Sequence, residues 1–319
     1  MAFGMRFRRP MFLLRAVLAA VLIFSLCRCA PEHGSEVPAS VPESAQTEAE
    51  TVAEPAVPDP PDEPPLYATD RYTVWALTAE RDGETVSGKL YVPVGEGTFP
   101  VVVCCHGFGG SGDNLSVFAQ AFAGNGVAAC VFDFVGGTVG PYGDADMTQM
   151  SVLTEAADLF AVIDRLKADP RLDRDRFFLL GHSQGGFVAT YAAGERPEEI
   201  AGLFLLCPAY VIRDKCEVLA PDPEHIPETM TLWGAKIGSV YVRDALSFDI
   251  ADSMRAYPGP VLLFHGTADG TVPIAYSEDA AKIFPNAELI VYEGEGHGLR
   301  LPVVKDAAAR ALALIRGEE

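Results

Sequence analysis

The sequence has few basic residues for its length. Of 319 residues, 24 are Lys or Arg and 44 are Asp or Glu, which gives a formal net charge of −20. Nucleic-acid binding requires a cationic face, because phosphate contacts dominate the affinity, so nucleic acid is not an expected partner. Hydrophobic residues make up 49% and charged residues 21% of the chain, a composition typical of a globular protein with a core.

The N-terminal apolar run is too short to span a bilayer, which requires about 20 residues. This uncharged run, 16–26, follows an arginine-rich start and precedes Cys27 and Cys29. The arrangement predicts a secretory signal over residues 1–30, with a buried core helix as the alternative. Cys29, with Leu26 three residues before it, resembles a bacterial lipoprotein cleavage site, but Arg28 stands where that pattern has a small residue. A lipid-anchored form and a freely secreted form therefore both stay open.

Residues 31–65 contain no Lys or Arg, but nine prolines and nine acidic residues. Such a segment has too little apolar surface to form a packed core. Proline and like charges keep a chain extended, so we expect a disordered acidic tether. The remaining residues, 66–319, show no internal repeat and fit one large domain.

Short apolar runs alternate with helical patterns along this domain, which predicts βαβ units and a mainly parallel sheet. The clearest helix is Val152–Lys167, where apolar residues recur at helical spacing. A turn at 81–84 predicts that the first two strands form an antiparallel hairpin. Eight strands are expected, over residues 72–78, 85–92, 99–105, 127–133, 176–181, 201–207, 260–265 and 288–292.

Residues 181–185 read Gly-His-Ser-Gln-Gly, a G-x-S-x-G pattern between the apolar run 177–180 and a helical pattern that starts at Phe187. A sharp strand-to-helix turn that exposes a serine requires small residues around it. The pattern therefore predicts that Ser183 is a catalytic nucleophile. The alternative is a glycine-rich turn in which Ser183 only caps the helix.

A serine hydroxyl needs an adjacent base to act as a nucleophile near neutral pH, and His297 is the best-placed histidine. It lies in a Gly-Glu-Gly-His-Gly loop after the last expected strand, and it follows the serine as the chain order of such triads requires. His33 lies in the tether and His225 in an irregular region, and the turn beside the serine is expected to direct the His182 side chain away from the site. His106 and His265 lie at strand ends, where structural roles are expected.

The third catalytic residue must be a carboxylate that fixes the tautomer of the imidazole. Asp269 is the expected acid, because it lies between Ser183 and His297 in the sequence and follows the strand 260–265. Ligands of α/β sheets bind at the carboxyl ends of strands. Two rival acids, Asp249 and Asp252, lie in a helical pattern. Two others, Glu293 and Glu295, are too close to His297 along the chain.

Acyl transfer also needs donors for the developing oxyanion. The backbone N–H of Gln184 follows the nucleophile directly, and the N–H of Phe108 lies in the glycine-rich loop after the third expected strand. We expect these two groups to form the oxyanion hole. That loop has neither a P-loop lysine nor a G-x-G-x-x-G pattern, and no Cys/His spacing fits zinc, so no cofactor and no metal are expected.

The pattern resembles the α/β-hydrolase serine esterases, and among them the bacterial cinnamoyl or feruloyl esterases. The resemblance covers most of residues 70–316. It implies the α/β-hydrolase fold, with a mostly parallel eight-stranded sheet, helices on both faces and a small lid. One departure is Asp-Phe-Val-Gly-Gly-Thr at 133–138, where many relatives have Gly-His-Gly. The segments that carry the resemblance are 106–108, 181–186, 206–209, 241–244, 265–269 and 296–297.

The expected lid spans about 209–247, a stretch of nearly 40 residues that interrupts the alternation of strands and helices. Its apolar residues suit a pocket, although packing of the lid on itself is the alternative for most of them. The resemblance places Tyr241 where related esterases have a lid tyrosine near the phenolic end of the substrate, so Tyr241 is an expected substrate-binding residue. Cys207 and Cys216, at the entry to the lid, could be bridged or reduced.

We therefore expect an exported serine carboxylesterase that forms an acyl-enzyme from small-molecule esters. The resemblance implies hydroxycinnamoyl esters. Two alternatives stay open: a serine peptidase of the prolyl-oligopeptidase type, and a catalytically silent binding protein with the same fold. The intact set of Ser183, Asp269 and His297 speaks against the silent protein. The expected location is outside the cell or anchored on the outer face of the cytoplasmic membrane.

Overall fold

The structure is a computed structural model that describes residues 64–138, 147–298 and 300–318. The expected signal, 1–30, and all but the last two residues of the expected tether, 31–65, lie outside these ranges and stay predictions. Among the described residues, none of the helices combines the length and the apolar character that a membrane crossing requires.

The main sheet has nine strands among the described residues, in the order β1-β2-β3-β5-β4-β6-β7-β10-β11. The first three pairs, β1 with β2, β2 with β3 and β3 with β5, are antiparallel, and the remaining pairs are parallel. The strands are β1 (Tyr67–Ala68), β2 (Tyr72–Arg81), β3 (Glu84–Pro93), β4 (Phe99–Cys105), β5 (Ala128–Phe132), β6 (Leu172–His182), β7 (Gly202–Leu206), β10 (Val261–Gly266) and β11 (Ala287–Tyr292).

The predicted α/β fold with a mostly parallel sheet is confirmed, with one strand more than the eight expected. The extra strand, β1, has two residues, too few to give a period-two pattern in the sequence. The predicted turn between β2 and β3 is present: Arg81 pairs with Glu84, and both central residues, Asp82 and Gly83, have positive φ angles of 52° and 86°. Such two-residue turns match the natural twist of a hairpin.

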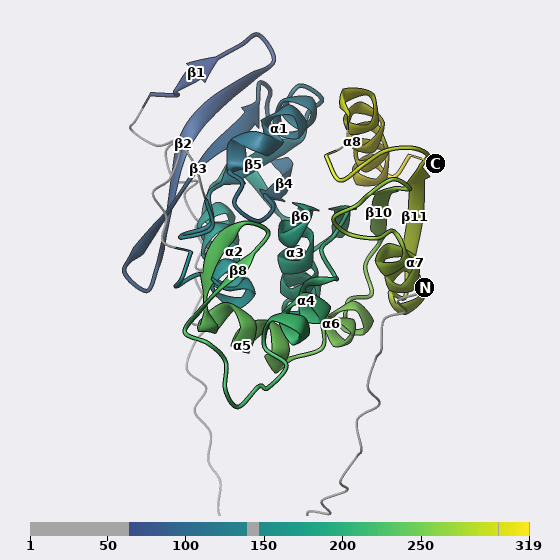
Figure 1. The fold of residues 1–319 in the computed structure, drawn as a ribbon. Helices are drawn as coiled ribbons and strands as arrows, with labels where there is room; N and C mark the ends of the chain where they lie inside the picture. Colours follow the sequence, from purple (N-terminus) through teal and green to yellow (C-terminus); the bar gives the residue numbers. More distant parts are fainter. Residues whose placement is uncertain (1–63, 139–146, 299, 319) are drawn as a thin grey trace, which may run out of the picture. The chain divides into compact units, whose positions relative to one another are not determined.

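Helices cover both faces of the sheet and bury two separate clusters of apolar side chains. On one face, α8 lies beside α1 (Figure 1). The other face is covered chiefly by α2, α3 and α7, with α6 packed against α3 and α7; α2 has the bounds that the sequence predicts. The helices of this layer structure are α1 (Ser116–Ala123), α2 (Val152–Lys167), α3 (Gln184–Glu195), α6 (Ile250–Ala256), α7 (Ala275–Ile283) and α8 (Leu301–Arg316), with short 3₁₀ turns at Gly112–Leu115 and Pro197–Glu199.

The segment 209–247, which we call the lid segment, lies between β7 and α6 in the chain. It contains α4 (Ile212–Leu219), a hairpin of β8 (Thr229–Leu232) and β9 (Ala235–Gly238), and α5 (Ser239–Ser247). Figure 1 shows β8 in green in front of the main sheet. The hairpin was not expected, because its turn residues, Trp233 and Gly234, are not a common turn pair; their φ angles are 47° and 86°.

The five cysteines of the described residues are all buried and all free. Cys104, Cys105 and Cys130 lie in the central strands β4 and β5, where they pack as small apolar residues. Cys207 and Cys216, whose pairing the sequence left open, do not form a disulfide.

Candidate active site

Ser183 stands at the turn from β6 to α3 in a strained backbone conformation, with φ 54° and ψ −118°. A non-glycine residue with positive φ persists only where its surroundings force it. Here the surroundings are backbone atoms of neighbouring elements. A Cβ atom on Gly181 would lie 2.4 Å from the carbonyl oxygen of Gly185, and one on Gly185 would lie 2.1 Å from that of Cys105. The glycines of the pattern are therefore required by close packing.

The three residues expected to form a triad meet in the structure, although they lie on three different loops. The Oγ atom of Ser183 is 2.9 Å from Nε2 of His297, and Nδ1 of His297 is 2.7 Å from Oδ2 of Asp269. An ionised carboxylate only accepts hydrogen bonds, so Nδ1 of His297 carries the proton and Nε2 is free to accept one from Ser183. This is the tautomer that base catalysis requires.

The carboxylate of Asp269 is held by several donors. Its Oδ1 accepts hydrogen bonds from the N–H groups of Thr271 and Val272, at 2.8 and 2.9 Å. Nε2 of His265 is 3.3 Å from Oδ2. Burial by itself would raise the pKa of the Asp269 carboxyl, but the hydrogen bonds from His265, His297 and Val272 lower it well below its usual range. Asp269 is therefore ionised at neutral pH.

Three of the rival acids have other partners. Asp249 caps α6 by accepting a hydrogen bond from the N–H of Ala251, and Asp252 pairs with Arg255 on the surface. The carboxylate of Glu295 accepts hydrogen bonds from the Arg300 guanidinium. None of these three is the acid that contacts His297.

His182 has a role that the sequence did not indicate. Its Nε2 lies 3.1 Å from the carbonyl oxygen of His297, and the centroids of the two rings are 5.1 Å apart. Burial lowers the pKa of His182 to about 4, so its ring is neutral and donates one N–H, which supports the backbone of His297. The expectation that this side chain points away from the site is wrong.

His106 and His265 make the contacts of structural residues. Nε2 of His106 accepts a hydrogen bond from the N–H of Phe134, and its Nδ1 lies 2.8 Å from the carbonyl oxygen of Gly107. The ring thus joins the loops after β4 and β5. His265 connects Ser277 and the carbonyl oxygen of Val272, and it shapes the loop that carries the acid.

The two N–H groups expected to form the oxyanion hole lie next to the serine. Gln184 is the first residue of α3, so its N–H has no partner inside the helix. Phe108 lines the two cavities that Ser183 also lines. Among the described residues neither N–H donates to a protein acceptor. Both are free to bind a developing negative charge.

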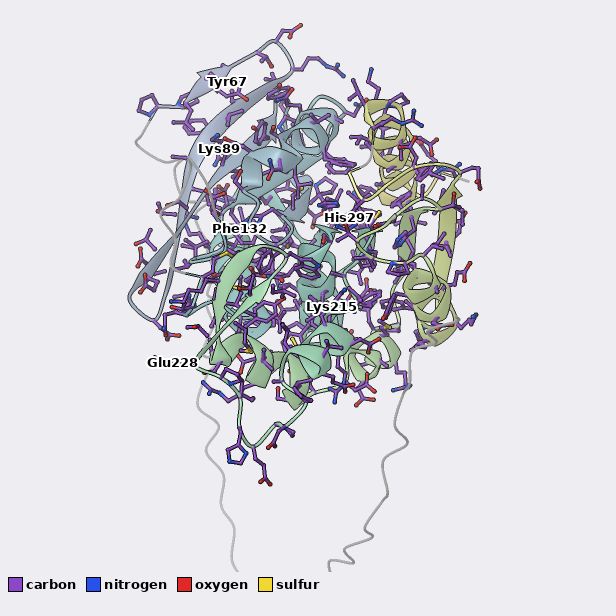
Figure 2. The ribbon with its side chains drawn as sticks, viewed as in Figure 1. Tyr67, Lys89, Phe132, Lys215, Glu228 and His297 are labelled. Atoms are coloured by element: carbon purple, nitrogen blue, oxygen red, sulfur yellow. The ribbon has the colours of Figure 1, made fainter. Side chains whose placement is uncertain are left out.

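A cavity of about 720 Å³ opens beside Ser183 and His297. Figure 2 labels His297 between α3 and the β10–β11 pair. The cavity has an aromatic wall, in which the rings of Phe108 and Trp233 pack edge to face with centroids 5.2 Å apart. A second hollow of about 240 Å³ reaches the same serine from the side of His106 and His182. The remaining lining residues of the large cavity are Gly109, Met147, Gly234, Ala235, Lys236 and Thr271.

Tyr241 does not lie where substrate binding requires it. Its side chain is fully buried and is not among the residues that line the two cavities. Its hydroxyl donates a hydrogen bond of 2.5 Å to Oε1 of Gln184. The expected direct contact with substrate is therefore corrected: α5 packs the tyrosine inward, and the exposed wall of the cavity comes from the β8–β9 turn, through Trp233.

One group of side chains among the described residues has the spacing of metal ligands. Ligand atoms of Cys207, Asp269 and His297 lie within 4.8 Å of one another. Two of the three already form the hydrogen bond between Nδ1 and the carboxylate. Burial raises the pKa of the Cys207 thiol to about 12, so the thiol is protonated at neutral pH and is a poor ligand. The arrangement fits a hydrogen-bonded triad better than a metal centre.

Two protein families match adjacent parts of the chain. The family described as "Serine aminopeptidase, S33" matches residues 98–249, and the family described as "TAP-like protein" matches residues 247–313. The first match contains Ser183 and the second contains Asp269 and His297. The boundary between them falls at the end of the lid segment.

Curated proteins match over shorter stretches. A non-heme chloroperoxidase from Kitasatospora aureofaciens is 41% identical over 66 residues, which are 20% of this chain and 24% of that protein. The quorum-quenching protein AidA from Acinetobacter baumannii is 30% identical over 128 residues, 38% of this chain and 40% of that protein. The chain therefore matches less than half the length of each.

Solved structures match over most of the domain. Est1E from Butyrivibrio proteoclasticus with bound ferulic acid is 26% identical, with a TM-score of 0.68, over 76% of this chain and 100% of that chain. A dienelactone hydrolase from Anabaena variabilis is 19% identical, with a TM-score of 0.57, over 78% of this chain and 99% of that chain. At that identity the second likeness concerns the fold alone.

Proposed function

We propose that the chain is a serine carboxylesterase of the α/β-hydrolase superfamily. The observation that carries the proposal is the continuous hydrogen-bond path from Ser183 Oγ through His297 to Asp269, at 2.9 and 2.7 Å. The serine at the start of this path lies beside a cavity with an aromatic wall. A catalytically silent protein would have no need for an ionised acid, an oriented base and a strained serine at one point.

The reaction proceeds through an acyl-enzyme. Oγ of Ser183 attacks the ester carbonyl while its proton passes to Nε2 of His297, and the imidazolium is stabilised by Asp269. The N–H groups of Phe108 and Gln184 bind the oxyanion of the tetrahedral intermediate. His297 returns the proton to the leaving alcohol as the ester C–O bond breaks. A water molecule, deprotonated by His297, then attacks the acyl-enzyme; the bond between the acyl carbon and Oγ breaks, His297 returns the proton to Ser183, and the acid is released.

Esters with an aromatic acyl group, of the hydroxycinnamoyl class, are the proposed substrates. The edge-to-face pair of Phe108 and Trp233 offers a wall on which an aromatic ring can pack. The cavity volume of about 720 Å³ lies within the range of small-molecule sites. Est1E, a structural relative with 26% identity, binds ferulic acid, which supports the same class here.

Peptide hydrolysis is the second candidate, because the family that matches residues 98–249 is described as a serine aminopeptidase. An aminopeptidase must bind the ammonium group of a free N-terminus, for which a carboxylate is the usual partner. Among the described residues that line the large cavity there is no Asp or Glu, and Lys236 carries a positive charge. This charge favours an ester over a free amino terminus.

The proposed location is outside the cytoplasmic membrane, with residues 1–30 as the export signal. The arginine-rich start and the uncharged run before Cys29 support it. N-terminal sequencing of the protein from fractionated cells tests the proposal, because an intact Met1 in cytosolic protein contradicts it. Incorporation of a labelled fatty acid distinguishes a lipid-anchored form from a freely secreted one.

The function is tested with Ser183→Ala and matched substrates. Purified protein is assayed on p-nitrophenyl acetate, a feruloyl ester and an aminoacyl amide. We expect turnover of the esters, and a loss of about 10⁶ in kcat for the variant with an unchanged far-UV circular dichroism spectrum. If the protein hydrolyses the aminoacyl amide but neither ester, it is a peptidase and the proposed esterase function is wrong. Equal rates for the variant and the natural protein would refute the role of Ser183.

A further inference from the structure

Tyr241 contacts both residues whose N–H groups form the proposed oxyanion hole. Its hydroxyl donates to Oε1 of Gln184 at 2.5 Å, and its ring packs edge to face against Phe108 with centroids 6.1 Å apart. Gln184 follows the nucleophile, and Phe108 lies in the loop after β4. One side chain of the lid segment thus joins the two sides of the hole.

The other end of the Gln184 amide is held as well. Its Nε2 donates a hydrogen bond of 2.8 Å to Oε2 of Glu155 on α2. Gln184, Glu155 and Tyr241 are each at least 99% buried. An amide bonded at both ends to groups from two other helices cannot rotate without breaking a buried hydrogen bond, which is costly. The first residue of α3 is therefore fixed relative to α2 and α5.

We propose that Tyr241 is a positioning residue for the reaction: through Gln184 and Phe108 it holds the two oxyanion donors at a fixed spacing. This inference rests on the proposed function and extends it. The lid segment then contributes to the rate of the chemical step for every acyl group, in addition to forming a wall of the cavity. A tyrosine that bound substrate directly would influence the hydrolysis only of substrates long enough to reach the lid segment.

The protonation states suit this role. Burial raises the pKa of the Tyr241 phenol well above its usual value, so the hydroxyl stays a donor. Burial also raises the pKa of the Glu155 carboxyl, more than its hydrogen bond from Gln184 lowers it. The raised pKa favours the neutral carboxyl, and a neutral network would hold Gln184 without placing a negative charge beside the hole, where a charge would oppose the oxyanion.

The test compares Tyr241→Phe with Tyr210→Phe. Tyr210 is also a fully buried tyrosine, and its hydroxyl lies 2.8 Å from Oγ1 of Thr190 on the same helix α3. Both variants remove one buried hydroxyl that is bonded to α3, but only Tyr241 contacts the oxyanion residues. The pair therefore separates a loss of positioning from a general loss of stability.

For Tyr241→Phe we expect kcat to fall by about tenfold, because small displacements of oxyanion donors are costly. The fall should be similar for p-nitrophenyl acetate and a feruloyl ester, with KM within about twofold. The inhibition constant of a trifluoromethyl ketone, whose adduct places an oxyanion in the hole, should rise by the same factor. Tyr210→Phe should leave all three unchanged. A change confined to KM for the feruloyl ester, or equal effects of the two variants, would overturn the proposal.

Gln184→Met gives an independent measurement, by itself if Tyr241→Phe does not fold and also in a double variant if it does. It removes the hydrogen bonds of the amide to Tyr241 and Glu155 but keeps a side chain of similar length. We expect at least the same fall in kcat, and no further fall in the double variant with Tyr241→Phe, because the tyrosine acts through the glutamine. A wild-type kcat for Gln184→Met, or additive effects in the double variant, would contradict the inference.

The rate at which an uncharged fluorophosphonate phosphonylates Ser183 tests the positioning role of Tyr241 independently of the proposed esterase activity. The labelling rate depends on the serine, its base and the hole, and it requires no ester turnover. A protein that labels rapidly but hydrolyses no carboxylic ester would contradict the esterase, while its labelling rates would still show whether Tyr241→Phe slows the reaction and Tyr210→Phe does not.

Discussion

The turn around Ser183 and the lid segment both border the large cavity, but they are held in different ways. At the turn, backbone packs on backbone: Gly185 lies so close to the carbonyl oxygen of Cys105 that even a methyl group would overlap it. Cys105 is in the central strand β4, which is paired with β5 on one side and β6 on the other. The nucleophile is thus fixed by the sheet itself, and its geometry does not depend on any single side-chain contact.

The lid segment also has backbone packing, since a Cβ atom on Gly238 would lie 1.9 Å from the carbonyl oxygen of Thr148, but side-chain contacts add to it. Ser151, at the start of α2, donates a hydrogen bond to the Asp244 carboxylate on α5, and Tyr241 donates to Gln184. Each of these contacts can be removed by one substitution without a clash. We therefore expect changes at the turn to abolish the site, and changes in the lid segment to adjust rate and substrate choice.

The largest effect is expected for Gly185→Ala. Its Cβ atom would lie 2.1 Å from the carbonyl oxygen of Cys105, and relief would require a shift of β4 or α3. We expect a loss of at least about 3 kcal/mol in the free energy of unfolding together with loss of activity, measured by urea denaturation and ester hydrolysis. Gly95→Ala is the control, because its Cβ would make only an ordinary contact of 3.5 Å. If Gly185→Ala and Gly95→Ala have equal free energies of unfolding, the close backbone contact of Gly185 does not hold the turn, and side-chain contacts must do so.

The turn could be predicted from the sequence because its requirements are local. Glycines on both sides of a serine, placed between a strand and a helix, are typical of a sharp nucleophile turn, and the chain order then directs attention to Asp269 and His297. The lid hairpin could not be predicted in this way. Its turn carries Trp233 at a φ of 47°, which is strained for a bulky residue, and only tertiary packing makes this conformation favourable.

The buried polar residues were missed for a different reason. Glu155 and Asp158 lie on the buried face of α2, in line with apolar residues, but acidic side chains are normally assigned to solvent. Asp158 is paired with Arg81 and Glu155 is bonded to Gln184. Neither partner can be identified from spacing, because each contact joins elements that are distant in the sequence. For the same reason the bond from Tyr241 to Gln184 could not be predicted, and the family resemblance placed Tyr241 at the substrate instead.

The next largest effect is expected for Asp269→Asn. An amide at this position donates as well as accepts, so it favours the wrong tautomer of His297. We expect kcat to fall by about 10⁴ with little change in the melting temperature, measured by steady-state kinetics and differential scanning calorimetry. Asp249→Asn is the control: Asp249 caps α6 and should leave kcat unchanged. A fall in kcat for the control instead would make Asp249 the acid.

Trp233→Ala tests the lid segment with a smaller effect. The substitution removes the aromatic partner of Phe108 from the cavity wall. We expect KM for a feruloyl ester to rise by roughly tenfold, the value of one aromatic contact, while p-nitrophenyl acetate is hydrolysed as before. Val218→Ala, which changes a residue on α4 that is 80% exposed, is the control within the same segment. A similar loss for both esters would mean that the hairpin supports the turn rather than the substrate.

The smallest effect at neutral pH, but one with a distinct pH dependence, is expected for Glu155→Gln. Burial raises the pKa of this carboxyl above its usual 4.5 in the folded protein, while the unfolded chain keeps the ordinary value. Between the two values the unfolded chain binds fewer protons than the folded one, so the natural protein loses stability as the pH rises. The titratable groups around Glu155 are Asp158 on the same helix, Cys105 on β4 and Tyr241 on α5, and none of them supplies a positive charge.

Glutamine keeps the shape and an oxygen for Gln184 but cannot ionise. Relative to the natural protein, Glu155→Gln should therefore gain stability with rising pH, by about 1.4 kcal/mol per unit between pH 5 and the folded pKa. Urea unfolding at pH 5 to 9 measures this difference, and Glu195→Gln, at an exposed position on α3, should run parallel to the natural protein. If the free energy of unfolding of Glu155→Gln also runs parallel to that of the natural protein over this pH range, Glu155 is ionised in the folded protein. The lid network would then carry a charge beside the oxyanion residues, and the two regions would be coupled by electrostatics rather than by a neutral hydrogen bond.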